Sequence, residues 1–301
     1  TLKPEKSWQR YMVGTLCVSK ELGCNLSGMN IMLTGDIPAG SGLSSSAALI
    51  LALLGGLVEF SQVTADPWQL VKASQRVEHI YLGVKCGLLD QIGSQMSVAN
   101  QVLEVDFQSL VVTPTEYKLP GYSWVALHTG KSRELAESAY QTRVVECKEA
   151  LEKLSTQNPH IETMRDIKAD DIQGNDSLTK RIRHVVEENK RVKQALGFIQ
   201  NNPESLGSVL DASHKSLRDD YEVSCDELNT MVEIARKHPA CVGARMMGGG
   251  FGGSTLNLVK TPQAQAFVDA TLAEYQNRYP SLKTSALIAE LVGGAGSVNL
   301  S

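Results

Sequence analysis

The feature that most constrains this chain is a glycine- and serine-rich segment that leads directly into an apolar stretch. The run PAGSGLSSSAA at 38–48 follows a predicted strand at 29–33 and precedes a predicted helix that extends to Val58. A helix N-terminus offers unpaired N–H groups and the positive end of the helix dipole, and glycine lets the backbone approach an anion closely. This order therefore predicts a loop that binds phosphate groups.

The sequence of this first glycine loop excludes two common nucleotide-binding motifs. It contains no GxxxxGK[ST], so it is not a Walker A loop, and its glycines do not open a helix as GxGxxG, so it is not a dinucleotide fingerprint. The structural alternative is an ordinary helix with a serine cap after a flexible turn. Both interpretations stay open at this point.

Two acidic residues follow the loop at a spacing of twelve. Glu78 lies in a predicted helix at 67–82, and Asp90 stands among apolar and small residues, which predicts a buried carboxylate. Phosphoryl transfer uses one carboxylate to hold Mg²⁺ and another to accept the proton of the attacking hydroxyl. The alternative for Asp90 is an N-cap on a short helix at 91–97.

A second glycine-rich segment lies near the end of the chain. Residues 248–253 read GGGFGG, with five glycines in six positions, between predicted strands at 241–247 and 254–259. This freedom suits a backbone that closes over a ligand, whereas the alternative is a plain hairpin crossing.

The remaining elements predict a mixed fold in two domains. The change from mixed helix and strand to mostly helix near 118–130 predicts an α/β (α+β) protein with domains at 1–121 and 122–301. The other predicted helices cover 7–24, 137–155, 177–200, 203–217, 225–237 and 262–277, and the other strands 101–107, 123–127 and 283–289.

Composition excludes several classes of function. The net charge of −4 gives no basic footprint for nucleic acid. The six cysteines include no CxxC pair, which excludes the usual zinc and dithiol patterns and favours reduced thiols in the cytoplasm. No apolar run approaches the roughly 20 residues that span a bilayer, so we expect no membrane partner.

The motifs, taken in order, resemble those of the GHMP small-molecule kinases, and within that superfamily those of the galactokinases. The resemblance rests on GDIPAGSGLSSSAA at 35–48, GVKCGLLDQ at 83–91, SHKSLRDDYEVSCDEL at 213–228 and GARMMGGGFGG at 243–253. It covers almost the whole chain. It implies a two-domain α/β fold with the active site between the domains, and transfer of the ATP γ-phosphate to the anomeric C1 hydroxyl of galactose with Mg²⁺. We expect a monomer.

The resemblance also implies roles for individual residues. Asp90 would be the base or would orient the C1 hydroxyl, and Ser46 and Glu78 would hold Mg²⁺. Trp8 and Tyr11 match a W-x-x-Y near the adenine pocket, although an aromatic pair at helical spacing is also typical of a core. The amides expected to bind the phosphates belong to Gly40, Ser41, Gly42, Leu43, Ser44, Ser45, Ser46 and Ala47. The residues expected to contact the sugar are Gly87, Asp90, Tyr140, Gly249 and Gly250.

Several departures keep alternatives open. The family's early motif GRxNLxGEHxDY, which grips the sugar, does not occur here, so we expect the start of the N-terminal domain to be missing and sugar binding to be weak. Met247 stands in place of the family's threonine and Ser254 in place of its cysteine. Lys131 and Arg133 are either surface charges or contacts to an acidic substrate. The alternatives are a kinase for another sugar or sugar acid, such as galacturonate or N-acetylgalactosamine, and a galactokinase-like sensor without catalysis.

Overall fold

The computed structural model describes residues 7–37, 42–132 and 136–297, which divide into two compact units. Unit 1 contains the described residues up to Glu116, apart from Gly42, together with the segment from Leu291. Unit 2 contains Gly42 and the stretch Tyr117–Glu290. Helices and strands occur in both units, so the mixed fold class predicted from the sequence is confirmed. The division into domains at 121/122 stays a prediction.

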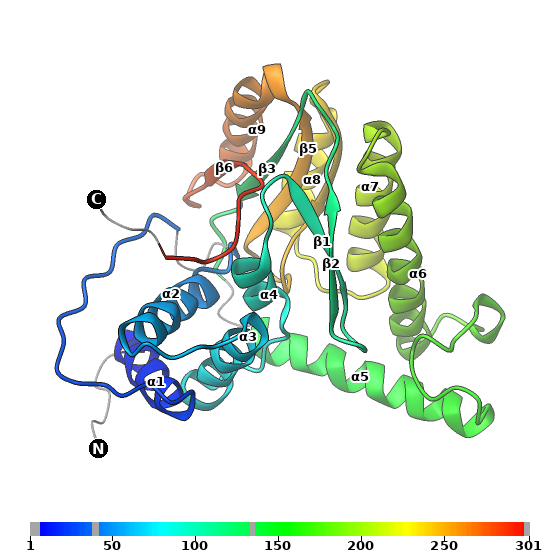
Figure 1. Ribbon diagram of the computed structural model, residues 1–301. Helices are drawn as coiled ribbons and strands as arrows, with labels where there is room; N and C mark the ends of the chain where they lie inside the picture. The colour runs from blue at the N-terminus through cyan, green and yellow to red at the C-terminus, as the bar shows by residue number, and fades with distance from the viewer. Residues whose placement is uncertain (1–6, 38–41, 133–135, 298–301) are drawn as a thin grey trace. The chain divides into compact units, whose positions relative to one another are not determined.

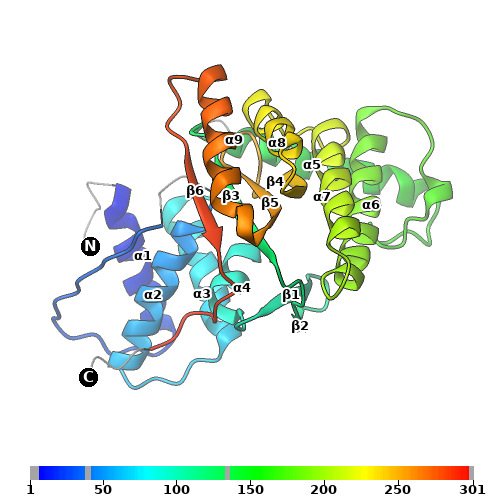
Figure 2. The same cartoon turned by 90° about the horizontal axis from the view of Figure 1, so that it is seen from above.

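Unit 1 is mainly a packed group of helices (Figures 1 and 2). Its elements are α1 (Ser7–Glu21), α2 (Ser45–Phe60), α3 (Pro67–Arg76), the π-helical turn η1 (Val77–Leu82), α4 (Leu89–Met96), and the antiparallel strands β1 (Gln101–Asp106) and β2 (Val111–Glu116). The helices bury one apolar cluster, which is formed by Val18, Cys24, Ile50, Leu51, Leu54, Val58, Leu70, Ala73 and Val77. Helix α2 is apolar over most of its surface, which explains its central position in this cluster.

The start of α3 shows how local sequence determines an element. The Asp66 carboxylate accepts a hydrogen bond from Gln69 N at 3.0 Å, and the Gln69 side chain accepts one from Asp66 N at 2.8 Å. This reciprocal pair is a capping box, and Pro67 at the first helical position has its φ already suited to a helix.

The strand predicted at 29–33 is wrong. Residues 29–37 have no regular secondary structure, and Met32 is 92% exposed. The apolar run suits a strand, but a strand needs a partner, and the described strands of unit 1 pair only with each other. Strand β2 was not predicted, because Pro114 interrupts its run. The proline is tolerated opposite Leu103 in a two-stranded pair.

Unit 2 contains a four-stranded antiparallel sheet with helices packed against it. The strands β3 (Tyr122–His128), β4 (Cys241–Met246), β5 (Ser254–Lys260) and β6 (Ser285–Ala289) lie in the order β4-β5-β3-β6. The helices are α5 (Ala136–Gln157), α6 (Ser177–Phe198), α7 (Pro203–Asp219), α8 (Asp226–Lys237) and α9 (Ala264–Arg278), with short 3₁₀ turns at Ala169–Asp171 and Thr261–Gln263. Helices α8 and α9 cover the sheet and bury a core that includes Leu127, Met231, Val259 and Phe267 (Figure 2).

Helix α7 and strand β4 approach each other backbone to backbone. A Cβ on Gly207 would lie 1.9 Å from the carbonyl oxygen of Val242, and a Cβ on Gly243 would lie 2.3 Å from that of Gly207. The ring of His214 continues the contact, because its Nδ1 accepts a hydrogen bond from Met246 N at 3.2 Å. His214 is therefore a structural residue that joins α7 to the sheet.

None of the helices in the described ranges is both long and apolar enough to cross a membrane.

Candidate functional site

The first glycine loop leads into α2 without a serine cap. Ser44, the residue before the helix, has φ 58° and its side chain makes no capping hydrogen bond. The interpretation of the loop as a serine-capped helix start is therefore wrong. Because the Ser44 hydroxyl does not cap α2, it does not compete with an anion at the positive end of the helix. Of the predicted phosphate contacts, Gly40 and Ser41 lie outside the described residues.

The two predicted metal ligands lie in direct contact. Ser46, in the first turn of α2, donates its hydroxyl hydrogen to Glu78 Oε1 at 2.6 Å, across 32 residues of sequence. Glu78 is only 5% exposed and lies in the π-helical turn η1. Wide turns of this kind occur frequently at functional sites, because they redirect a side chain that a regular helix would point elsewhere.

Two neighbours that the sequence did not single out orient Glu78. Cys86 donates its Sγ hydrogen to Glu78 Oε2 at 3.0 Å, and Gln91 Nε2 donates to the same oxygen. Burial and then the Glu78 carboxylate raise the pKa of the Cys86 thiol to about 12, so the thiol keeps its hydrogen and remains a donor. Both residues stand inside the GVKCGLLDQ motif, which was the available signal, but only the fold reveals their partner.

The cluster has the chemistry of a magnesium site. The hydroxyl of Ser46 and the carboxylate of Glu78 are hard oxygen ligands, and Gln91 Oε1 is buried without a hydrogen-bond partner. The described part of the chain contains no group of three or more His, Cys, Asp or Glu residues that could enclose a metal. Mg²⁺ commonly takes only one or two protein ligands and fills its other positions with phosphate oxygens and water. The residues present therefore fit this ion.

Asp90 lies on the exposed side of α4. It occupies the first turn of the helix rather than the position before it, so the predictions of a buried carboxylate and of an N-cap are both wrong. The next residue, Gln91, is fully buried against Glu78. Consecutive helical residues point in different directions, so α4 buries the amide of Gln91 and leaves the Asp90 carboxylate accessible to a substrate. Gly87 is also exposed, and a Cβ there would meet no atom within 4 Å.

Trp8 and Tyr11, which are predicted to lie near the adenine, both belong to α1 but have different environments. Trp8 is 58% exposed, so it does not belong to the core. Tyr11 packs against the apolar cluster of unit 1, and burial followed by the charge of Glu78 raises the pKa of its phenol. Tyr11 therefore lies close to Glu78, whereas Trp8 faces solvent.

The second glycine loop, residues 248–253, connects β4 to β5 in unit 2. Four of its glycines and Phe251 have positive φ, a conformation unlike that of a plain two-residue hairpin turn. The loop lies beside Tyr140 of α5, because a Cβ on Gly249 would be 3.9 Å from Tyr140 Cδ2. Lys131 pairs with Glu227 at 2.7 Å, so it contributes to an internal ion pair. Arg133 lies outside the described residues.

Comparison with known proteins identifies the family. The profile of the GHMP kinases N terminal domain matches residues 10–97, and that of the GHMP kinases C terminal domain matches residues 184–277. Galactokinase from Exiguobacterium sibiricum is 36% identical over 291 residues, which cover 94% of this chain and 74% of that protein. Galactokinase from Bacillus subtilis is 34% identical over 299 residues, which cover 97% of this chain and 76% of that protein.

Solved structures agree with these relatives. The crystal structure of Lactococcus lactis galactokinase complexed with galactose matches with a TM-score of 0.86 and 32% identity, over 98% of this chain and 78% of that one. A crystal structure of mevalonate kinase matches with a TM-score of 0.62 at 18% identity, over 91% and 74% of the two chains, and supports the fold alone. The chain therefore belongs to the galactokinases, within the GHMP kinase superfamily.

Proposed function

We propose that this chain is an ATP-dependent sugar kinase that phosphorylates the C1 hydroxyl of galactose. The observation that carries the proposal is the 2.6 Å hydrogen bond between Ser46 and Glu78. It joins the first turn of the helix after the glycine loop to a buried carboxylate, which is the arrangement that a metal–triphosphate substrate requires. The phosphate oxygens would accept hydrogen bonds from the amides of the first glycine loop, from Gly40 to Ala47.

We further propose that Ser46 and Glu78 hold Mg²⁺, which when bound neutralises charge on the β- and γ-phosphates. Cys86 and Gln91 occupy the far carboxylate oxygen of Glu78 and so keep the near oxygen directed at Ser46. Trp8 and Tyr11 would lie near the adenine. The exposed position of Trp8 suits a ring that stacks on a base.

Asp90 is the proposed base. Its exposed carboxylate can accept the proton of the C1 hydroxyl as that oxygen attacks the γ-phosphorus, while the bond to the β–γ bridging oxygen breaks and ADP leaves. Gly87, Tyr140, Gly249 and Gly250 are proposed sugar contacts. The support for them is the exposed position of Gly87 and the adjacency of Tyr140 to Gly249.

The named relatives favour galactose over the other substrates considered, and they favour an enzyme over a sensor. We propose a cytoplasmic location, because all six cysteines are free thiols, as expected in a reducing compartment. The expected monomeric state stays a prediction, which sedimentation would test.

The function can be tested by ADP release from MgATP with a panel of acceptors: galactose, N-acetylgalactosamine, galacturonate, arabinose and mevalonate. We expect turnover with galactose. The substitution Asp90→Asn should reduce it at least 100-fold while leaving ATP affinity within about twofold, since general-base contributions are on the order of 10²–10⁴.

The matched control is Asp66→Asn. It makes the same chemical change in unit 1 and keeps the N-cap of α3, because asparagine caps as well as aspartate. Turnover only with a sugar other than galactose would overturn the assignment of galactose as the substrate. Binding of MgATP without turnover on any acceptor would support a sensor instead of an enzyme.

A further inference from the structure

The middle of the second glycine loop, at Gly250 and Phe251, lies against the backbone of Val223. Phe251 N donates a hydrogen bond to the Val223 carbonyl oxygen at 2.8 Å. A Cβ on Gly250 would lie 2.0 Å from the same oxygen, so the two backbones touch. Val223 is also buried in a small apolar cluster against which Phe251 packs. A displacement of Val223 would therefore displace the middle of the glycine loop, at Gly250 and Phe251.

The residue before Val223 has a strained backbone. Glu222 has φ 55°, in the left-handed region that a residue with a Cβ rarely adopts, and Phe251 across the hydrogen bond has φ 59°. Conformations of this kind persist only where the surrounding structure holds them. Glu222 therefore needs contacts that hold its backbone in this conformation.

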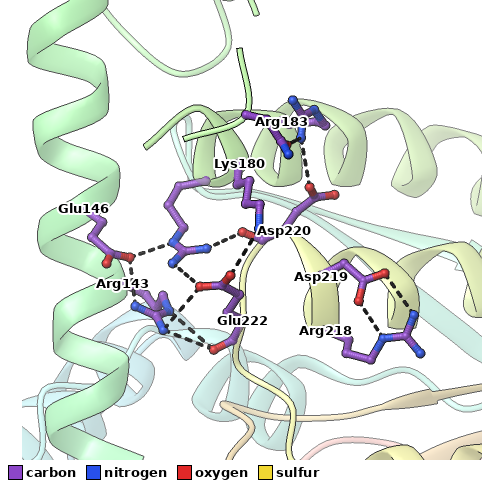
Figure 3. Close-up of polar contacts among 10 residues, drawn as sticks. Arg143, Glu146, Lys180, Arg183, Arg218, Asp219, Asp220 and Glu222 are labelled. Carbon is purple, nitrogen blue, oxygen red and sulfur yellow. Dashed lines mark hydrogen bonds and ion pairs between the residues drawn. The ribbon is translucent and has the colours of Figure 1, made fainter. Parts of the chain in front are cut away.

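Three basic residues hold Glu222 (Figure 3). Arg181 Nη2 donates to Glu222 Oε2 at 2.7 Å, and Lys180 Nζ lies 3.4 Å from Oε1. Arg143 donates to the Glu222 backbone oxygen at 3.3 and 3.4 Å. Both the side chain and the main chain of the strained residue are thus held, and the hydrogen bond from Arg181 keeps the pKa of Glu222 below its usual value.

Arg181 lies at the centre of the group of charged residues around Glu222 and is only 1% exposed. Its Nε donates to Glu146 Oε2 at 2.6 Å, and its Nη1 donates to the Asp220 carbonyl oxygen. Burying a guanidinium is costly, and well-packed apolar side chains often stabilise a fold as well as a buried ion pair does. Stability alone therefore gives no reason for Arg181, whereas holding the turn at 220–222 in one geometry does.

The charged residues around Glu222 are also connected, through helix α5, to Tyr140, another proposed sugar contact. Tyr140, Arg143 and Glu146 follow one another at intervals of three along α5, so they share a helix face. That face contacts the cluster through Arg143 and Glu146 and lies beside Gly249 through Tyr140. The ion pairs therefore connect the two structures of unit 2, the second glycine loop and α5, that are proposed to contact the sugar.

We propose that Arg181, Glu146 and Glu222 form a positioning cluster that fixes the second glycine loop and Tyr140 relative to each other as a rigid sugar-contact surface. The inference rests on the proposed function, which assigns sugar contacts to Tyr140, Gly249 and Gly250. None of the three cluster residues touches the sugar; they act through the Val223 carbonyl and through α5.

The decisive variant is Glu222→Gly. Glycine adopts φ near +55° without strain, so the fold should be kept, while the side chain that Arg181 and Lys180 hold is removed. We expect the amide of Phe251 to exchange its hydrogen at least 10-fold faster, and the KM for galactose to rise about 10-fold with the KM for ATP unchanged. Arg181→Lys should give a smaller change in the same direction, because lysine keeps the charge but cannot bridge Glu146, Glu222 and Asp220 together.

The matched control is Arg218→Ala. Arg218 pairs with its neighbour Asp219 in an ion pair close to the cluster, but both side chains are about half exposed and neither contacts Glu222 (Figure 3). This variant should change neither readout.

The outcomes are distinct. Unchanged exchange at Phe251 in a folded Glu222→Gly protein overturns the proposal, and so does faster exchange with an unchanged KM for galactose. Hydrogen exchange needs no turnover, whereas failure of the proposed function would appear in the unsubstituted chain as an absence of galactose-dependent ADP release.

Discussion

Helix propensity and tertiary packing make opposite predictions for Gly207→Ala. Alanine in the middle of a helix is more favourable than glycine by about 1 kcal/mol, so the sequence alone predicts a stabilised α7. In the structure, the new Cβ would lie 1.9 Å from the Val242 carbonyl oxygen and 2.5 Å from its carbon. An ordinary contact begins near 3.4 Å, so α7 and β4 would have to separate by about 1.5 Å.

That separation breaks identifiable interactions. The hydrogen bonds from Met246 N to His214 Nδ1, at 3.2 Å, and from Ala244 N to Asp211 Oδ1, at 3.0 Å, both join α7 to β4. Each is worth about 1 kcal/mol, and overpacking adds about 1–3 kcal/mol. After the gain in helix propensity, we expect the free energy of unfolding to fall by about 2–4 kcal/mol.

The assay is urea unfolding followed by far-UV circular dichroism, with Gly197→Ala as the matched control. Gly197 also lies in a helix of unit 2, and a Cβ there would meet nothing within 4 Å. This variant should be neutral or stabilised by up to about 1 kcal/mol. If Gly207→Ala were as stable as Gly197→Ala, the close approach of α7 and β4 would be refuted.

Three further results are expected. Burial lowers the pKa values of His184 and His214 from 6.5 to about 4, so between these pH values the unfolded chain binds protons that the folded chain does not. Unfolding measured at a series of pH values should therefore show stability lost as the pH falls from about 6.5 to 4, and His184→Gln should reduce the slope. The exposed thiol of Cys17 should react with a maleimide well before Cys86, whose pKa is about 12, as mass spectrometry of digested peptides would show. Ser46→Ala should raise the Mg²⁺ concentration needed for half-maximal turnover about 10-fold, because one of the two proposed protein ligands is lost.

The sequence predicted elements well where one local signal dominated. The capping box at Asp66 and the apolar α2 are local features, and both elements appear where they were expected. The strand at 29–33 was wrong because pairing depends on a partner that local pattern does not supply. Strand β2 was missed for the converse reason, since pairing with β1 outweighs the penalty of Pro114.

The site was predictable in its residue types but not in its geometry. Ser46 and Glu78 were predicted from motif wording, and their contact across 32 residues is visible only in the fold. Apolar neighbours suggested a buried Asp90, but burial follows the helix face, which places Gln91 inside and Asp90 outside. The strained backbone of Glu222 has no sequence signal, because glutamate is not a residue that typically adopts this conformation.

Because Glu78 is a proposed Mg²⁺ ligand, the π-helical turn at Val77–Leu82 makes the number of residues in this segment important for the proposed function. Each residue of an α-helix advances the direction of its side chain by about 100°, and a wide turn accommodates one residue more than a regular helix would. Deleting one residue of the turn other than Glu78 should restore a regular helix and rotate Glu78 relative to Ser46 or to Gln91. In a relative that keeps every proposed site residue but has one residue fewer in this turn, the Glu78 carboxylate would therefore no longer lie beside Ser46, Cys86 and Gln91. Under the proposed role of Glu78, gaps in an alignment at this turn are consequently as informative about activity as substitutions of Glu78 itself.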